Sequence, residues 1–334
     1  MTSNFSLKHY LRIGSIVCNI SSNTSRYASM LAEAYSTHLI DRGTSEENNP
    51  EVVLRFFIRE DPCSKLSEKD TIVVSSTKKG FKIETDPISC YLEINSRSTE
   101  DNEAVADFIV HQPELETNLL AYHLYLITNR ILLLLDALLV HAAAIELNGV
   151  VNLFCGHKGA GKSTLSLFLA QAGAHILAED RIVLRQREKD FLVSGCSSKM
   201  KIMSKTEQFL IPNQLDIEAS LISGIPKKIF NAEQFFSAIP YVDRKPARLF
   251  LNQVGNSFKL KQISANEALL KMVDRTGNMY RFGCHQDYSS FFNFITSFIN
   301  QVECYSLDLS ANLNDLPLLL EALNELDKIS TPKT

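Results

Sequence analysis

The sequence lacks several features that would assign it at once to a class of protein. It has no basic excess, since its net charge is −4 over 334 residues, and a general binder of nucleic acid or membrane surfaces would normally be basic. The opening stretch MTSNFSLKHYLRIG contains no apolar run of the signal-peptide kind. The most apolar region, Leu119–Ile145, is interrupted by Arg130 and Asp136, whereas a membrane span needs about 20 nearly uninterrupted apolar residues. We therefore expect no nucleic-acid partner and no membrane segment.

The cysteines also lack a pattern, because no C-x-x-C pair occurs among the seven. An odd, scattered set is typical of reduced thiols in a cytoplasm, and each cysteine is expected to be a small buried apolar residue. The sequence shows no internal repeat and no low-complexity tract. Its 45% hydrophobic and 22% charged residues are ordinary for a globular protein, and its length allows two domains. The cysteines are Cys18, Cys63, Cys90, Cys155, Cys196, Cys284 and Cys304.

Residues 1–115 are expected to form a small α+β domain in front of a second domain, 116–334. The sequence predicts a helix over Thr24–Ile40, with Asn23 or Thr24 as its N-cap, among several short strands. This first domain suits either a docking module for a substrate peptide or partner, or a structural cap. The predicted strands are His9–Ile20, Val52–Ile58, Thr71–Ser75, Phe81–Glu84 and Cys90–Ile94, and the predicted loops are Asp41–Pro50 and Asn95–Asn102.

The second domain begins with a helix over Leu119–Leu135 that is apolar on most faces and is therefore expected to be buried. Two β-rich runs, 139–147 and 150–155, then flank Asn148-Gly149. Asn-Gly between such runs is a strong hairpin signal, because both turn residues must accept positive φ. The remaining predictions are strands at 175–184, 248–254, 258–263 and 303–309, helices over Ala265–Val273, Tyr288–Ile299 and Leu316–Leu326, and core packing of Phe291, Phe292, Phe294 and Phe298.

One motif carries the chemistry: 156-GHKGAGKST-164 fits the phosphate-loop pattern G-x-x-x-x-G-K-[S/T] at each fixed position. Its context agrees, because the strand VVNLFC precedes it and the helical run STLSLFLAQAG follows it, closed by Gly173. Such a loop points its backbone N–H groups, and the N-terminal end of its helix, at nucleotide phosphates. The predicted nucleotide-binding residues are Gly156, His157, Lys158, Gly159, Ala160, Gly161, Lys162, Ser163 and Thr164.

Within the loop, Lys162 is expected to neutralise charge on the β- and γ-phosphates and the Ser163 hydroxyl to ligate Mg²⁺. Thr164 is interpreted as a helix-start residue, and His157 and Lys158 as solvent-facing side chains. An acidic pair, Glu179-Asp180, follows the apolar run HILA. Charges that emerge from a core need a partner, which Lys162 with Mg²⁺ would supply. The two adjacent carboxylates can also divide the work, one organising the metal and the other taking the proton from an attacking hydroxyl.

The segment HAAAIELNGVVNLFCGHKGAGKSTLSLFLAQAGAHILAEDRIVL resembles the catalytic core of the HPr kinase/phosphorylase family, bacterial protein-serine kinases with a phosphate loop. Members have a His on the strand before the hairpin, a loop of the form G-x-x-G-x-G-K-S, and Ala-Asp-Asp after a helix that ends in Gly. The resemblance is strong over 141–184 and weak from there to Leu326. It looks closer to divergent kinases of the family, some of which accompany peptide natural-product pathways. The matching positions are His141, Gly156, Gly159, Gly161, Lys162, Ser163 and Ala178-Glu179-Asp180-Arg181.

The resemblance implies an α/β phosphate-loop kinase core of the type shared with phosphoenolpyruvate carboxykinase. It also implies ATP- and Mg²⁺-dependent phosphate transfer to a hydroxyl, usually a serine, of a peptide, protein or small molecule, and it allows a homo-oligomer. The catalytic residues it implies are Glu179, Asp180, His141 and Lys162. In the family the first acid of the pair is the acid/base. Glu179, one methylene longer, stands at that position here.

The sequence departs from the family after the acidic pair, where members carry Glu-x-Arg-Gly-x-Gly and this chain reads LVSGCSSKMKIMSKT. Lys199 or Lys201 is a candidate for the missing positive charge. Lys227, Lys228, Arg244 and Arg248 are other candidates, each of which is more often a solvated surface charge.

Three hypotheses stay open at this stage. The first is an ATP-dependent hydroxyl kinase, favoured by the loop, the acidic pair and His141 together. The second is a nucleotide-binding regulatory or scaffold protein with a degenerate kinase site, which Glu179 keeps open. The third is a nucleotide-dependent hydrolase or motor, for which the sequence shows no glutamine or arginine-finger pattern.

Overall fold

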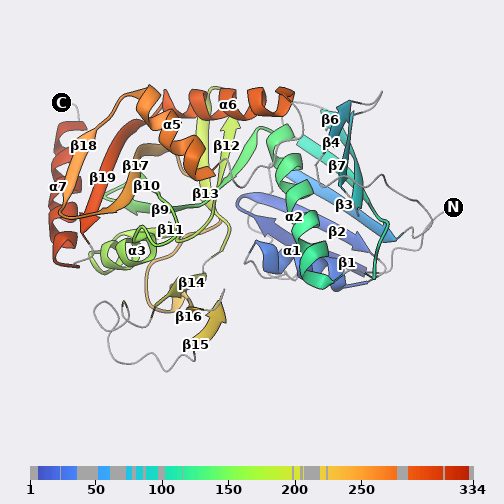
Figure 1. Ribbon diagram of the computed structural model, residues 1–334, viewed down its shortest axis with the longest axis horizontal. Helices are drawn as coiled ribbons and strands as arrows, with labels where there is room; N and C mark the ends of the chain where they lie inside the picture. The colour runs from blue at the N-terminus through green and yellow to red at the C-terminus, as the bar shows by residue number, and fades with distance from the viewer. Residues whose placement is uncertain are drawn as a thin grey trace. The chain divides into compact units, whose positions relative to one another are not determined.

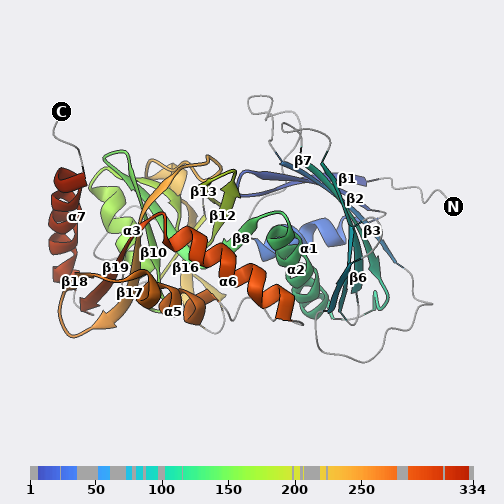
Figure 2. The same ribbon diagram turned by 90° about the horizontal axis from the view of Figure 1, so that it is seen from above.

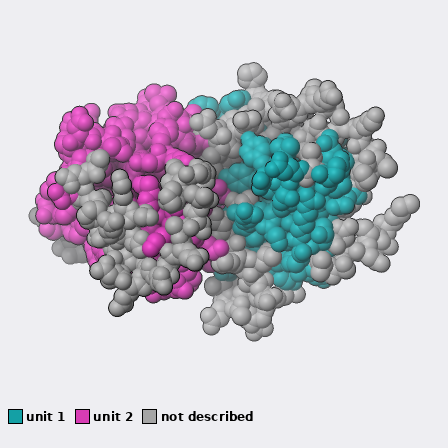
Figure 3. Space-filling model, turned by 60° about the horizontal axis from the view of Figure 1, so that its bottom comes forward, with its two compact units in different colours: residues 1–139, 278–292 teal, residues 140–277, 293–334 magenta. Residues whose placement is uncertain are grey.

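A computed structural model of the protein shows a mixed α/β fold with several sheets (Figure 1). It forms two compact units, residues 1–139 with 278–292 and residues 140–277 with 293–334 (Figure 3). The predicted boundary at residue 115 differs from this division, because helix α2 (Thr117–Leu134) packs on helix α1 and on strands β5 and β6. The structure describes residues 7–22, 24–35, 52–60, 73–76, 80–85, 88–96, 102–114, 116–197, 199–203, 206, 219–222, 225–276, 285–310 and 313–330.

Unit 1 contains a seven-stranded sheet with the order β1-β2-β3-β7-β6-β5-β4. The predicted single strand His9–Ile20 is wrong, because the chain turns at Gly14 (φ 64°) and forms an antiparallel pair. Strand β7 lies in the middle of the sheet and escaped prediction. The strands are β1 (Leu7–Ile13), β2 (Ile16–Ser22), β3 (Val52–Glu60), β4 (Val73–Ser76), β5 (Gly80–Thr85), β6 (Ile88–Ser96) and β7 (Asn102–Val110).

Helix α1 (Arg26–Ala34) is shorter than predicted at both ends. The hydroxyl of Thr24 accepts a hydrogen bond from the Arg26 amide at 3.2 Å, although the N-cap position itself is Ser25. The predicted loop Asp41–Pro50 lies outside the described residues, as do 97–101. The predicted loop Asn95–Asn102 is wrong at both ends, where β6 and β7 continue.

Unit 2 is built on a six-stranded sheet with the order β11-β9-β10-β17-β19-β18. The predicted hairpin is confirmed: β9 and β10 pair antiparallel around Asn148 (φ 53°) and Gly149 (φ 77°). Strands β10, β17 and β19 run parallel, and β19 separates β17 from β18. The strands are β9 (Ala142–Leu147), β10 (Val150–Cys155), β11 (His175–Ala178), β17 (Pro246–Gly255), β18 (Lys259–Gln262) and β19 (Glu303–Ser310); β8 (Ala137–Val140) leads into them.

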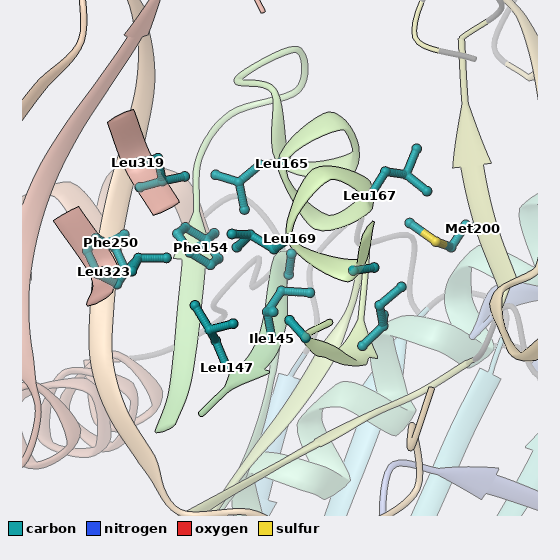
Figure 4. Close-up of a cluster of buried hydrophobic side chains, with 14 of the residues drawn as sticks. Ile145, Leu147, Phe154, Leu165, Leu167, Leu169, Met200, Phe250, Leu319 and Leu323 are labelled. Carbon is teal, nitrogen blue, oxygen red and sulfur yellow. The ribbon is translucent and has the colours of Figure 1, made fainter. Parts of the chain in front are cut away.

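A row of aromatic rings crosses the parallel strands, with Phe154 stacked on Phe250 at 5.0 Å and Phe250 on Tyr305 at 5.2 Å. Figure 4 shows leucines of α3 (Lys162–Gln171) and of α7 (Leu316–Ser330) gathered around these rings. Burial of such side chains contributes about 1.5–3 kcal/mol each. This packing fixes the start of α3 above the end of β10, where the phosphate loop lies.

The run 175–184 is not one strand, because β11 ends at Ala178 and β12 begins at Ile182 in a different sheet. The acidic pair therefore lies in the bend between two strands. Helix α5 (Ala265–Thr276) contacts β17 and β19 (Figure 2). The other elements of unit 2 are β12 (Ile182–Arg187), β13 (Asp190–Gly195), β14 (Lys199–Ile202), β15 (Ala219–Ile222), β16 (Ile225–Asn231) and the short helices η2 (Ala232–Gln234) and η4 (Leu313–Asp315).

Helix α6 (His285–Ile299) carries the phenylalanines that were predicted to pack in the core. Phe291, Phe294 and Phe298 are buried, but Phe292 is 39% exposed, so the prediction is wrong for that residue. The five cysteines in the described part of the chain are buried and free, as predicted, while Cys63 and Cys284 lie outside it. Within the described ranges, no helix combines the length and the apolar character needed to cross a bilayer.

Arg248 is not a solvated surface charge, because its side chain on β17 is 1% exposed. Its guanidinium lies 2.5 Å from Asp327 Oδ1 on α7 and 3.2 Å from Glu303 Oε2 on β19. We expect Arg248→Met to lower the free energy of unfolding by about 1–3 kcal/mol, because Asp327, whose side chain is only 16% exposed, loses its charged hydrogen-bond donor.

Chemical denaturation of the two purified proteins checks this expectation. Lys245→Met is the control, since the Lys245–Asp190 pair is exposed on both sides and such pairs contribute about 0–1 kcal/mol. A loss below about 1 kcal/mol in Arg248→Met would contradict a structural role for the buried pair.

Candidate functional site

The phosphate loop joins β10 to α3 through residues 156–161, as the motif predicts. Gly159 (φ 88°) and Gly161 (φ 82°) have the left-handed backbone that favours glycine. At Gly156 the constraint is space, because a Cβ would lie 2.5 Å from the Asn252 carbonyl oxygen and 2.8 Å from Ala160 Cβ. The glycines of the motif are therefore required by the geometry of the loop itself.

Lys162 is buried at the first position of α3 and folds back over the loop. Its Nζ donates hydrogen bonds to the carbonyl oxygens of Gly156 at 2.7 Å and of His157 at 3.2 Å. Burial lowers the pKa of this ammonium, because removal from water disfavours its charged form. Backbone carbonyls satisfy the ammonium geometrically but do not neutralise it, so the loop holds a desolvated positive charge.

Glu179 is 6% exposed and is connected directly to the loop, since the Ser163 hydroxyl donates a hydrogen bond to its Oε1. Its other oxygen, Oε2, is buried and has no hydrogen-bond partner among the described residues. Burial first, and then the neighbouring Asp180 charge, raises the pKa of Glu179 to about 7. The carboxyl group can therefore exist in either protonation state near neutral pH, which suits proton transfer.

The raised pKa of Glu179 has a consequence for stability. The folded chain binds this proton more tightly than the unfolded chain, so the folded state is favoured below pH 4.5 and loses that advantage as pH rises through about 7. At pH 8 we expect Glu179→Gln to have a free energy of unfolding up to about 3 kcal/mol larger than wild type, and therefore a higher melting temperature. Near pH 4.5 the two proteins should be equally stable. Thermal melts at both values check this; a lower melting temperature at the alkaline value would contradict it.

Asp180 has the opposite character. His141 Nδ1 lies 3.1 Å from Asp180 Oδ1 and 2.9 Å from the Asp180 carbonyl oxygen, and because both atoms accept, Nδ1 carries the proton. Burial raises the pKa of Asp180, but the hydrogen bond and charge of His141, with the charges of Lys201 and Arg181, outweigh burial and hold that pKa well below its usual range. Lys201 Nζ is 3.9 Å from Asp180 Oδ2. Asp180 is thus a permanent anion beside a titratable Glu179.

The structure places the remaining predicted residues at different distances from this centre. His157 and Lys158 are exposed, and His157 Nε2 lies 2.9 Å from Asp274 Oδ2. Thr164 Oγ1 lies 3.3 Å from Thr206 Oγ1, away from the acidic pair. Of the other candidate cations, Lys201 and Lys227 act on the acidic pair, whereas Arg244 pairs with Glu146 at 3.0 Å.

Asn252 and Arg275, which lie against the loop, also escaped prediction. Asn252, on β17, donates from Nδ2 to the Ala160 carbonyl at 2.8 Å, and its buried Oδ1 has no hydrogen-bond partner in the described part of the chain. Arg275, in the last turn of α5, donates from Nη1 to the Cys155 carbonyl at 2.7 Å. The polar ending of the apolar run RLFLNQ is a signal for Asn252. The sequence holds no comparable signal for Arg275, because only the folded chain brings α5 to the loop.

The donor atoms at the centre fit a nucleotide with a hard divalent cation. Ser163 Oγ, the unpartnered Oε2 of Glu179 and the anionic Asp180 are oxygen ligands of the kind that Mg²⁺ prefers. No group of three His, Cys, Asp or Glu side chains in the described part of the chain forms a metal site by itself.

Known proteins provide a partial match. No protein-family profile matches the chain. HPr kinase/phosphorylase from two strains of Leptospira biflexa serovar Patoc is 31% identical over 61 residues, which are 18% of this chain and 19% of each relative, so the match spans about a fifth of their length. The solved HPr(Ser) kinase/phosphatase from Coxiella burnetii aligns with 57% of this chain and 96% of its own, at 15% identity and a TM-score of 0.30. The sequence match confirms the predicted resemblance to the HPr kinase/phosphorylase family over that segment.

Proposed function

We propose that this protein is a Mg²⁺-dependent kinase that transfers the γ-phosphate of ATP to a hydroxyl group, usually a serine, of a peptide, protein or small molecule. One observation carries the proposal: a buried carboxyl group with a pKa of about 7, Glu179, accepts a hydrogen bond from Ser163 of the phosphate loop. A group that titrates near neutral pH is thereby held where the terminal phosphate of a loop-bound nucleotide would lie. The sequence match to HPr kinase/phosphorylase supports the same reaction type.

The nucleotide would be held by residues 156–164, with backbone N–H groups and the start of α3 directed at its phosphates. Lys162 would exchange its carbonyl contacts for phosphate oxygens, since its charge has no strong counter-ion at close range in the loop. Bound Mg²⁺ would neutralise charge on the phosphates, and Ser163 and Asp180 are the residues proposed to hold it. The chain core would then be of the kind shared with phosphoenolpyruvate carboxykinase.

The proposed reaction assigns separate tasks to the two carboxylates. Ionised Glu179 accepts the proton of the acceptor hydroxyl while the hydroxyl oxygen forms a bond to the γ-phosphorus. The bond between the γ-phosphorus and the bridging oxygen of the β-phosphate breaks, and ADP leaves. Asp180, kept anionic by His141, would help to hold Mg²⁺, which would neutralise charge on the phosphates. Unit 1 would dock the acceptor or a partner, and the protein would act in the cytoplasm, alone or as a homo-oligomer.

A second function has one observation in its favour. Glu179 stands where the HPr kinase/phosphorylase family has aspartate, and the additional methylene moves the carboxyl group that would act as the base. A nucleotide-binding regulatory or scaffold protein with a degenerate kinase site would tolerate this change.

Calorimetric titration tests the nucleotide site independently of the unknown acceptor. A non-hydrolysable ATP analogue is expected to bind with micromolar affinity when Mg²⁺ is present, and roughly 10-fold or more weakly in its absence, because the proposed Ser163 and Asp180 ligands act through the ion. Absence of binding under both conditions would overturn the proposed function and the regulatory alternative together.

A further inference from the structure

We propose that Arg275 is a second cation of the phosphate site. It would contact the nucleotide phosphates near the start of the loop, whereas Lys162 follows the end of the loop. This inference rests on the proposed function, since it assigns a further residue to the same nucleotide site. It extends the site to helix α5, which no motif in the sequence connects with phosphate binding.

The last turn of α5 meets the loop at two points. Arg275 Nη1 donates to the carbonyl of Cys155, the last residue of β10, at 2.7 Å. Asp274, the preceding residue, lies with Oδ2 2.9 Å from His157 Nε2. The guanidinium therefore lies at the point where the strand enters the loop, one residue before the Gly156 carbonyl that Lys162 contacts.

Lys162 and Arg275 are thus paired with consecutive backbone carbonyls, of Gly156 and Cys155, at the entrance of one loop. The two positive charges are close enough that Arg275 lowers the pKa of Lys162, although burial is the larger cause. Cys155 between them supplies no counter-charge, since burial raises the pKa of its thiol to about 11. Two neighbouring cations that each contact backbone carbonyls rather than carboxylates form a site that an anion would complete.

Acidic groups near this pair are engaged in other contacts. Burial lowers the pKa of Arg275 and outweighs the opposing charge of Asp274, whose carboxylate is 68% exposed and lies against His157. Glu179 and Asp180 act on Lys162 and are themselves held by Ser163 and His141. A triphosphate carries more negative charge than one lysine and one divalent cation neutralise, and the planar guanidinium matches phosphate oxygens in pairs. Arg275 supplies the remaining charge.

The test compares phosphate-bearing and phosphate-free ligands in calorimetric titrations of the full chain. Arg275→Gln keeps N–H donors for the Cys155 carbonyl and removes the charge. We expect its affinity for the Mg²⁺ complex of a non-hydrolysable ATP analogue to fall roughly 10- to 100-fold, while its affinity for adenosine changes less than about 2-fold. Lys271→Gln is the control one turn earlier on α5, where Lys271 contacts Glu267 and Ser306, and it should bind both ligands as wild type does.

Arg275→Lys keeps the charge without the fork of donors and should recover part of the lost affinity for the triphosphate. Equal losses for adenosine and triphosphate in Arg275→Gln, or unchanged triphosphate affinity in a folded variant, would overturn the role of Arg275 and leave the kinase proposal intact. If Arg275→Gln does not fold, full wild-type triphosphate affinity in Arg275→Lys overturns the guanidinium contact. If the wild-type chain binds neither the ATP analogue nor adenosine, the proposed function itself would be overturned.

Discussion

Lys162→Ala is expected to lower kcat/KM for phosphate transfer by roughly 10³-fold, the scale of loss when one preorganised charge is removed from a transition state. The lysine is buried at the start of α3 and its ammonium is held by two loop carbonyls, so it is positioned before any nucleotide arrives. Charge that develops on the transferring phosphate would meet a donor that needs little rearrangement. Steady-state transfer rates with saturating Mg²⁺ measure the effect.

Lys259→Ala is the matched control for this substitution, because Lys259 is an exposed lysine on β18. It should leave kcat/KM unchanged. A decrease in kcat/KM of less than about 3-fold in Lys162→Ala would contradict a role for the loop lysine in stabilising the transition state. Removal of such a charge normally costs far more.

The rate of wild-type transfer is expected to rise as pH increases through about 7, because Glu179 accepts a proton only when ionised and its pKa lies there. Glu179→Gln removes the acceptor while keeping the size of the side chain and its ability to accept the Ser163 hydrogen bond. Loss of a general base typically costs about 10²–10⁴-fold in rate. The remaining activity should no longer increase over this range.

The pH–rate profile of Asp180→Asn provides the comparison for Glu179→Gln. The pKa of Asp180 is held far below neutral, so its ionisation does not shape the wild-type profile near pH 7. Asp180→Asn should be slower at every pH and should keep a rising limb, moved to lower pH because the repulsion from Asp180 that raises the pKa of Glu179 is gone. A rising limb that persists in Glu179→Gln would assign the proton transfer to another group.

Local patterns predicted the parts of this fold that local physics determines. The Asn148-Gly149 turn, the strand before the loop, helix α3 and the left-handed Gly173 (φ 93°) each depend on residues a few positions apart. The strand β7 was missed because its inward positions include Ala104 and Ala106, which give a weak strand signal, and because one of its two neighbours, β3, comes from a distant part of the sequence.

In the candidate site, too, only the features that depend on neighbouring residues could be predicted from the sequence. The phosphate-loop motif and the acidic pair can be found in the sequence, but the division between Glu179 and Asp180 cannot. That division depends on burial, on the Ser163 contact and on His141, which lies 39 residues before Asp180. Asn252 and Arg275 reach the loop from β17 and α5, so their roles depend on tertiary packing rather than on spacing.

Mass spectrometry of acceptor candidates tests the kinase proposal most directly. The small peptides and proteins encoded beside this gene would be incubated with the protein, ATP and Mg²⁺ at a pH above the pKa of Glu179. We expect one candidate to gain a single phosphate with wild type and to gain far less in the same time with Lys162→Ala or Glu179→Gln. No gain on any candidate by a protein that still binds ATP would contradict the kinase proposal and would favour a nucleotide-binding regulatory protein.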